Sequence, residues 1–206
     1  MKYSFDFLKN KINELQDEKR FKHTIGVANE AFELGKIFLP EKKEKLMVAG
    51  LLHDITKCFT IEKQIELCKI FNISYNKETL APKLFHAKTG CEFSREIFGI
   101  EIVDDEIYNS ILYHTTGRAD MTLFETIIYL ADYIEAGRTF FDCVELRKFF
   151  YDNIVKTKDT NEKLEVLRQT MLLSFDMTIK NLINEQKAID YDTINARNFF
   201  LQNTPK

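Results

Sequence analysis

The sequence predicts an all-α protein, and the main reasons are its few helix-breaking residues and its hydrophobic spacing. The chain of 206 residues contains only three prolines and seven glycines, and runs rich in Val and Thr, which favour strands, are missing. Apolar residues instead recur at intervals of three and four, which places them on one face of an α-helix. Hydrophobic residues make up 45% of the chain, so the predicted helices can bury a sizeable core.

The first half of the chain is predicted to form six helices. An apolar stripe from Phe5 to Leu15 marks the first of them. Thr60 is a candidate N-cap for the fourth helix, a loop through Pro82 precedes the fifth, and Gly99 has the position of a C-cap after it. The expected helices span residues 5–15, 20–38, 41–57, 61–71, 86–99 and 104–114.

The second half is also predicted to be helical, beginning with the strongly apolar stretch MTLFETIIYLADYIEAGR. The expected helices here span residues 121–138, 163–186 and 190–201. No linker, repeat or charge block divides the chain. We therefore expect a single domain over residues 1–206, with a core at about 20–140 and C-terminal helices of residues 160–203 packing on it.

Composition excludes several classes of protein. No apolar run approaches the roughly 18 residues of a membrane span, and the N-terminal stretch MKYSFDFLKNKINEL is amphipathic and unlike a signal peptide. The four cysteines form no CxxC pair, which is typical of a reducing cytoplasm. A formal net charge of −3 argues against a general nucleic-acid groove. We expect a cytoplasmic protein that binds neither membranes nor nucleic acid; a homodimer stays open.

Every histidine of the chain shares a helix face with apolar residues or a glycine. Each lies three, four or seven residues from such positions, the spacing that brings side chains onto one face. Asp132, within an apolar segment, shows the same spacing. Asp54 directly follows His53 in VAGLLHDITK. The polar residues predicted to point inward are His23, His53 with its neighbour Asp54, His86, His114 and Asp132.

A shared metal site explains this set better than separate burial does. A single buried histidine is more often an ordinary hydrogen-bonded core residue. Inward-pointing imidazoles and carboxylates from five helices, however, can all be satisfied at once by a divalent cation that binds the nitrogens and balances the negative charge. Imidazole with carboxylate suits iron, zinc, manganese or nickel, so ligand type leaves the metal open.

Several cations and hydroxyls near these motifs are candidates for binding an anionic substrate. Lys57 lies one turn after the His-Asp pair, and Arg118 and Arg138 each follow a glycine at the end of a segment. Thr115 and Thr116 follow His114 and could donate to phosphate. Each of these residues could equally be a solvated side chain or part of a turn.

The order of these residues, H…HD…H…H…D, resembles the HD-domain superfamily of metal-dependent phosphohydrolases. The stretches AGLLHDITK, LFHAKTG, ILYHTTGRADMT, IIYLADYIEAGR and TINARNFF are similar to the YqeK-type subgroup, the symmetrical bis(5′-nucleosyl)-tetraphosphatases. The resemblance runs from Arg20 to Phe200. It implies an all-α HD-domain helical bundle, an iron centre of one or two ions, and a metal-activated water that cleaves diadenosine tetraphosphate into two ADP.

The resemblance also implies roles for individual residues. The positions that match iron ligands are His23, His53, Asp54 and Asp132. His86 and His114 match positions that face the nucleotide phosphates and could hold a second metal, with Asp54 as the bridge. Catalytic roles are therefore expected for Asp54, Lys57, His86 and His114. Substrate binding is expected for Arg20, Asp54, Lys57, His86, His114, Thr115 and Arg138.

The chain departs from the subgroup at two places. Ala136 stands where relatives often carry Pro, which affects only a helix end. Asp190 and Tyr191 stand where relatives often show His-Pro, and this puts base contacts from the C-terminal segment in doubt.

Two other functions remain open. An HD-type nucleotidase or deoxynucleotide triphosphohydrolase would keep the metal centre and act on another nucleotide. A non-catalytic nucleotide-binding regulator would keep the fold and lose turnover, but the complete ligand set disfavours it. A cyclic-dinucleotide phosphodiesterase is disfavoured because the GYP signature of that subgroup is absent.

Overall fold

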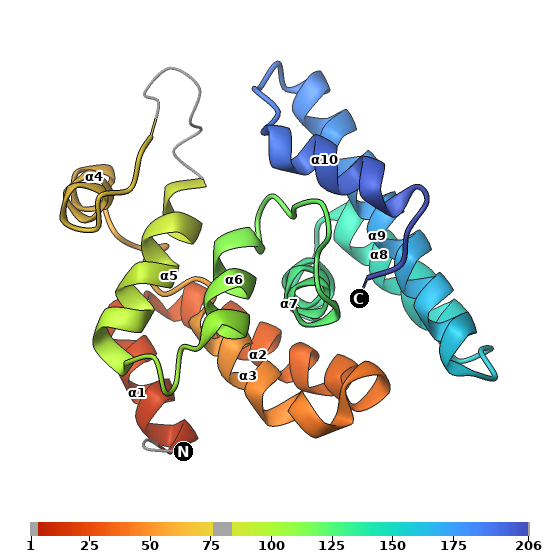
Figure 1. Ribbon diagram of the computed structural model, residues 1–206, viewed down its shortest axis with the longest axis horizontal. Helices are drawn as coiled ribbons and strands as arrows, with labels where there is room; N and C mark the ends of the chain where they lie inside the picture. Colours follow the sequence, from red (N-terminus) through yellow and green to blue (C-terminus); the bar gives the residue numbers. More distant parts are fainter. Residues whose placement is uncertain (1–3, 76–83, 206) are drawn as a thin grey trace.

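The computed structural model describes residues 4–75 and 84–205 and confirms the all-α prediction for them (Figure 1). Within these ranges it contains ten α-helices, one short 3-10 helix and no strand. The elements are α1 (Phe5–Leu15), α2 (Glu18–Phe38), η1 (Pro40–Lys42), α3 (Lys43–Leu52), α4 (Ile61–Ile70), α5 (Phe85–Phe98), α6 (Asp105–Tyr113), α7 (Leu123–Ile134), α8 (Phe141–Ile154), α9 (Thr160–Asn184) and α10 (Tyr191–Phe200). The loop expected through Pro82 lies outside the described residues.

Helix ends follow local capping chemistry. The Thr60 side chain accepts a hydrogen bond from the Lys63 backbone N–H, so the predicted N-cap of α4 is confirmed. Gly99 ends α5 as predicted, with a φ of 78° that favours glycine. At α7 the cap is a full capping box, in which Thr122 and Glu125 satisfy each other's backbone N–H groups.

Helix α7 lies at the centre of the fold. In Figure 1 it is seen end-on, with α6, α2 and α3 on one side and α8 and α9 on the other. It packs against α2, α3, α6 and α8. Its side chains are apolar around most of the helix, as a helix buried on all sides requires. The fully buried core residues of this helix include Ile127, Ile128, Leu130, Ala131 and Ile134.

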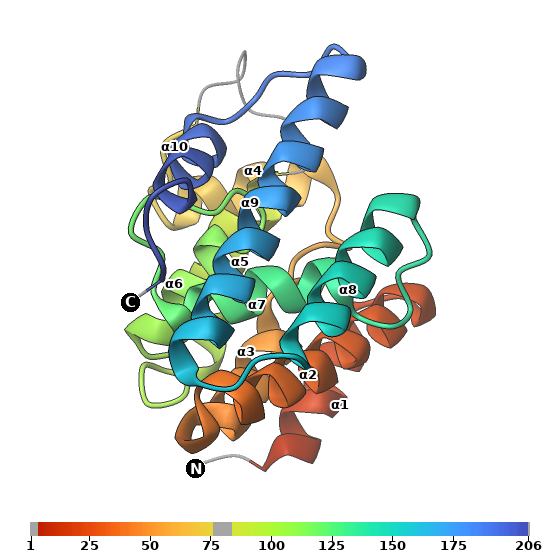
Figure 2. The ribbon, with the colours of Figure 1, turned by 90° about the vertical axis from the view of Figure 1, so that its right-hand side faces the viewer.

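The C-terminal helices share this core. Figure 2 shows α9 running beside α8, with α10 lying against the other side of α9. The rings of Phe175 on α9 and Phe200 on α10 stack with centroids 5.9 Å apart. Both rings are fully buried and belong to the same hydrophobic cluster as α2, α3 and α7.

The structure corrects the predicted set of helices in two respects. The helix expected over residues 41–57 ends at Leu52, and residues 53–58 form tight turns closed by bonds such as that from the Lys57 N–H to the Asp54 carbonyl (3.0 Å). Helix α8 was not predicted at all. Its buried residues, Cys143, Leu146, Phe150 and Ile154, nevertheless follow helical spacing and could have revealed it.

Among the described residues, no helix combines the length and hydrophobicity that a bilayer crossing requires.

Candidate metal centre and substrate site

Four of the predicted ligands converge from three parts of the chain. His23 comes from α2, His53 and Asp54 directly follow α3, and Asp132 comes from α7. The Nε2 atom of His23 lies 3.0 Å from Oδ1 of Asp132. The Nε2 atom of His53 lies 3.4 Å from Oδ2 of Asp54 and 3.7 Å from Oδ1 of Asp132.

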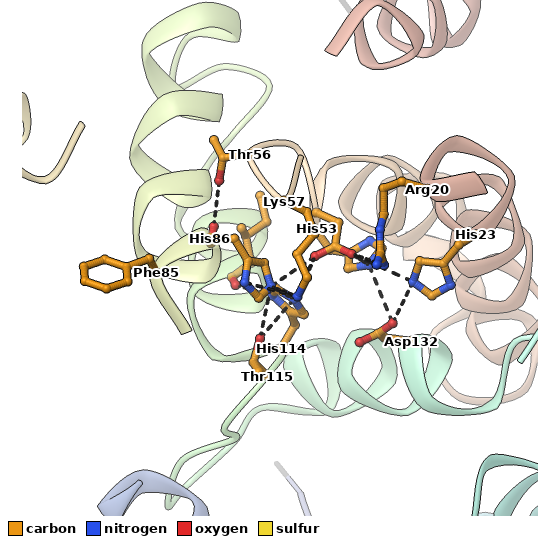
Figure 3. A network of polar contacts seen from close by, with 12 residues as sticks. Arg20, His23, His53, Thr56, Lys57, Phe85, His86, His114, Thr115 and Asp132 are labelled. Atoms are coloured by element: carbon orange, nitrogen blue, oxygen red, sulfur yellow. Dashed lines mark hydrogen bonds and ion pairs between the residues drawn. The ribbon is translucent and has the colours of Figure 1, made fainter. Parts of the chain in front are cut away.

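The other two histidines extend the cluster on the far side of Asp54. His86 lies in the first turn of α5, and His114 caps the C-terminus of α6. Their Nε2 atoms lie 3.1 and 3.6 Å from Oδ1 of Asp54 and 3.0 Å from each other. Figure 3 shows the result as an elongated cluster, with Arg20, His23 and Asp132 at one end and His86, His114 and Thr115 at the other.

Neighbouring oxygens fix the orientation of three imidazoles. Nδ1 of His53 lies 2.6 Å from the Gly50 carbonyl, and Nδ1 of His114 lies 2.7 Å from the Ile111 carbonyl. Nδ1 of His23 lies 3.0 Å from a carboxylate oxygen of Glu135. Since carbonyl and ionised carboxylate oxygens only accept hydrogen bonds, each Nδ1 carries the proton and each Nε2 keeps a lone pair facing the cluster.

The inward-facing atoms fit a cation. Among the described residues, the buried Nε2 atoms of His23 and His53 and the Oδ1 atom of Asp54 have no hydrogen-bond partner. When His23 is neutral, its Nε2 atom and Oδ1 of Asp132 are two acceptors that face each other across 3.0 Å. Such an arrangement is costly unless a positive ion lies between the atoms. The cluster can therefore bind metal, and two ligand groups within it, His23–His53–Asp132 and His53–Asp54–His114, are each compact enough to hold an ion.

Protonation states also favour metal binding. Burial alone would raise the pKa of Asp54, but the neighbouring His53, His114 and His86 outweigh it and hold the pKa well below its usual range. Burial is likewise opposed at Asp132, whose pKa the Arg138 charge keeps well below the usual range. Burial lowers the pKa of His53, and it lowers that of His86 to about 4. At His23, burial alone would lower the pKa, but the hydrogen bonds with Asp132 and Glu135 outweigh it and raise the pKa, so a metal would compete with a proton there. Ionised carboxylates and neutral imidazoles are the ligand forms that metals require.

The cations expected at the site are present. Arg20 Nη1 donates to Oδ2 of Asp54 at 2.8 Å, and Arg138 binds both the carboxylate and the backbone carbonyl of Asp132. Lys57 Nζ lies 3.1 Å from Nε2 of His86 and 3.9 Å from Oδ1 of Asp54.

Two further candidates have different outcomes. The Thr115 hydroxyl lies 3.1 Å from Nε2 of His114, at the edge of the cluster. Arg118, by contrast, forms a two-pronged ion pair with Glu125, with N···O distances of 2.9 and 3.1 Å. It supports the α7 capping box, and the pairing of its charge with Glu125 disfavours Arg118 as a residue that binds an anionic substrate.

Sequence reasoning missed Glu135, which holds His23 in place. This side chain is only 3% exposed, and its carboxylate also accepts a hydrogen bond from the Gly137 N–H at 2.6 Å. Gly26, one turn after His23 on α2, leaves the room that the Glu135 carboxylate occupies, because a Cβ at this position would collide with it. The available signal was the spacing of Glu135, three residues after Asp132 at the end of the same helix.

Comparison with known proteins defines the class. Residues 20–137 match the HD domain family model, so the chain belongs to the HD domain family. This confirms the resemblance found in the sequence. The match includes all six residues of the cluster, whose positions range from His23 to Asp132.

Individual proteins similar to this chain include two enzymes and one crystal structure. The chain is 31% identical over 184 residues to the symmetrical bis(5′-nucleosyl)-tetraphosphatase of Bacillus subtilis (strain 168), covering 89% of this chain and 90% of that one. The enzyme of the same name from Staphylococcus aureus is 31% identical over 166 residues, covering 80% and 82%. A crystal structure from Clostridium acetobutylicum, described as a predicted HD superfamily hydrolase involved in NAD metabolism, superposes with a TM-score of 0.82 at 36% identity and covers 97% of both chains.

Proposed function

We propose that the protein is a metal-dependent hydrolase that cleaves dinucleoside polyphosphates symmetrically, converting diadenosine tetraphosphate and water into two ADP. The observation that carries this proposal is the intact cluster of four histidines and two aspartates, flanked by Arg20, Lys57 and Arg138. Two relatives that align with this chain over most of their length are named symmetrical bis(5′-nucleosyl)-tetraphosphatases. These names support the proposed substrate class.

The ligand set is part of the proposal. His23, His53, Asp54 and Asp132 would hold one ion, and His86 and His114 could hold a second with Asp54 between them. Iron is favoured by the resemblance, while zinc, manganese and nickel fit the same donors. When bound, a divalent cation makes a coordinated water acidic enough to ionise near neutral pH and neutralises charge on phosphate oxygens.

The surrounding side chains would bind and orient the polyphosphate. Its negative charge attracts Arg20 and Arg138, whose planar guanidinium groups are suited to two-pronged contacts with phosphate oxygens. Lys57 and the Thr115 hydroxyl can donate hydrogen bonds to the phosphate whose oxygen leaves, where negative charge develops during bond breaking. The bond that breaks joins the second and third phosphates, so each product keeps two.

Three other expectations, on location, oligomeric state and domain organisation, remain predictions. A cytoplasmic location is supported by four free cysteines. A homodimer and a single folding domain over residues 1–206 are still expected.

Product analysis is the direct test of this activity. Protein purified without chelators is expected to contain a transition metal by elemental analysis and to convert diadenosine tetraphosphate into ADP alone, as resolved by anion-exchange chromatography. Formation of AMP with ATP would contradict symmetrical cleavage. If the protein left diadenosine tetraphosphate intact but hydrolysed deoxynucleoside triphosphates, the result would favour the alternative HD-type phosphohydrolase.

Replacing Glu135 by alanine is expected to weaken metal binding by about 10- to 100-fold, because His23 loses the partner that fixes its tautomer and ring orientation. Glu135→Gln keeps an oxygen that can accept from Nδ1 and should lose less. Affinity would be measured by titrating the chelated and dialysed protein with metal in a calorimeter. Glu33→Ala, which removes an exposed carboxylate from α2, the helix that carries His23, is the control. Equal affinities for Glu135→Ala and the control would remove Glu135 from this role.

A further inference from the structure

Arg147 joins helix α8 to the C-terminal end of α7, against which α8 packs (Figure 2). Its Nε donates to the Ile134 carbonyl at 2.6 Å, and its Nη2 donates to the carbonyls of Glu135 and Arg138, the latter at 2.8 Å. All three oxygens belong to the segment where α7 ends. Within the described residues, the hydrogen bonds of Arg147 therefore go to backbone oxygens and not to a carboxylate.

These oxygens need partners because a helix leaves its last carbonyls without one. Helix α7 ends at Ile134, and the backbone of Glu135 is extended, with a φ of −55° and a ψ of 146°. The next two residues, Ala136 and Gly137, are exposed, so no buried side chain anchors the middle of the turn. The partial negative charge at the C-terminus of a helix also favours a cation there. The guanidinium of Arg147 supplies both the donors and the charge.

The turn from Glu135 to Arg138 contacts two of the predicted metal ligands. It is closed by a hydrogen bond from the Arg138 N–H to the Glu135 carbonyl at 3.0 Å. At its first residue, the Glu135 carboxylate lies 3.0 Å from Nδ1 of His23 on α2. At its last residue, Nε of Arg138 donates to the Asp132 carbonyl at 2.8 Å, and Nη2 binds the Asp132 carboxylate. A shift of this turn would therefore move the partners of ligands from two helices at once.

We propose that Arg147 is a positioning residue of the metal centre, which fixes the Glu135–Arg138 turn and, through this turn, the orientation of His23 and Asp132. The inference rests on the ligand set proposed above. None of the hydrogen bonds of Arg147 to the described residues reaches the cluster itself. Replacing a side chain that orients a metal ligand typically costs about 10- to 100-fold in metal affinity. Arg147 acts one contact further away, so we expect the lower end of this range.

The informative variant is Arg147→Lys. Burial raises the pKa of Glu30, and the Arg147 charge is one of the groups that oppose this rise. A neutral residue at position 147 would therefore disturb Glu30 as well as the turn. Lysine keeps the positive charge but has one nitrogen in place of the two that bind the three carbonyls. A loss caused by Arg147→Lys thus reports the missing hydrogen bonds.

Two measurements on this variant test the inference. Titration of the chelated and dialysed protein with Mn²⁺ in a calorimeter is expected to show an affinity about tenfold weaker than that of the unmodified protein. Amide hydrogen exchange followed by NMR is expected to be faster at Gly137 by on the order of tenfold. The Gly137 N–H donates to Oε2 of Glu135 at 2.6 Å, so its exchange reports, without metal, whether that carboxylate is in place.

Arg168→Lys is the matched control. Arg168 on α9 also donates to carbonyls at the C-terminal end of a neighbouring helix, here Phe200 at 2.8 Å and Leu201 at 3.3 Å at the end of α10. This variant weakens a similar helix cap that is not connected to the Glu135–Arg138 turn. It should leave both readouts unchanged.

A rescue variant tests whether the turn transmits the effect. Ala136 is the second residue of the turn, a position that favours proline, and the extended backbone of Glu135 is compatible with a following proline. The Ala136 N–H has no hydrogen-bond partner among the described residues, so a proline there removes none. In the Arg147→Lys background, Ala136→Pro should therefore stiffen the turn and recover roughly two- to fivefold of the lost affinity for Mn²⁺.

The outcomes separate this inference from the proposed activity. Unchanged exchange at Gly137, or an affinity for Mn²⁺ that falls no more than in Arg168→Lys, would reduce Arg147 to a helix cap even if the products were still two ADP. A loss of affinity that Ala136→Pro does not reduce would also overturn the inference. The expected losses and rescue would support it even if diadenosine tetraphosphate were left intact, and the proposed activity alone would then fail. Unmodified protein that binds no Mn²⁺ would overturn the inference together with the metal centre.

Discussion

Replacing Asp54 by asparagine is expected to lower the turnover of diadenosine tetraphosphate by on the order of 10³-fold or more while the helices remain folded. Asp54 is the side chain that the two halves of the cluster share, since Oδ2 lies 3.4 Å from His53 and Oδ1 lies 3.1 Å from His86. The variant keeps the size of the side chain but loses its negative charge. Arg20 and Lys57 would then face the site without that charge, and their repulsion would weaken the binding of a divalent cation.

Metal content and helicity distinguish this explanation from simple unfolding. Asp54→Asn protein should retain its far-ultraviolet circular dichroism and contain less metal by elemental analysis. Asp152→Asn is the control, because it removes a carboxylate that is 53% exposed and pairs only with Lys148 among the ion pairs of the described residues. Undiminished turnover in Asp54→Asn would exclude Asp54 from the chemistry.

The residues of the cluster could be predicted from the sequence because helical spacing makes them share a face with buried neighbours. His23 and Asp132 show this, since each lies four residues from an apolar residue on its own helix. The local backbone was less predictable. His53 and Asp54 lie just after α3 ends, and the turn there directs both side chains into one site.

Contacts between distant segments account for what the sequence could not predict. Glu135 meets His23 across 112 positions of the chain, and nothing local to either residue encodes that approach. Arg118 shows the opposite case, because its glycine-arginine context resembles that of Arg138 while its partner is Glu125. Sequence pattern assigns a residue to a helix face, whereas packing of whole helices decides which charges meet.

The same packing makes Gly117 a position where a small change should cost much stability. Gly117 follows the His114–Thr116 turn and has a φ of 65°, in the left-handed region that disfavours residues with a Cβ. A Cβ there would lie 2.6 Å from Cζ of Phe175 and 3.0 Å from Cβ of Ala196, both fully buried. Gly117→Ala should therefore lower the free energy of unfolding by about 2–4 kcal/mol, the sum of backbone strain and overpacking.

Guanidinium-induced unfolding measures this cost and separates its two causes. Gly90→Ala is the control, because this glycine lies within α5 and its nearest neighbours would be 3.5 Å from a Cβ, so the change should be neutral or slightly stabilising. In the Phe175→Leu background the ring atoms that collide with the new Cβ are gone, and Gly117→Ala should cost less by about 0.5–3 kcal/mol. Strictly additive costs would mean that backbone strain and the contact with Ala196 explain the loss, and that the α9 ring does not limit the turn carrying His114 and Thr115.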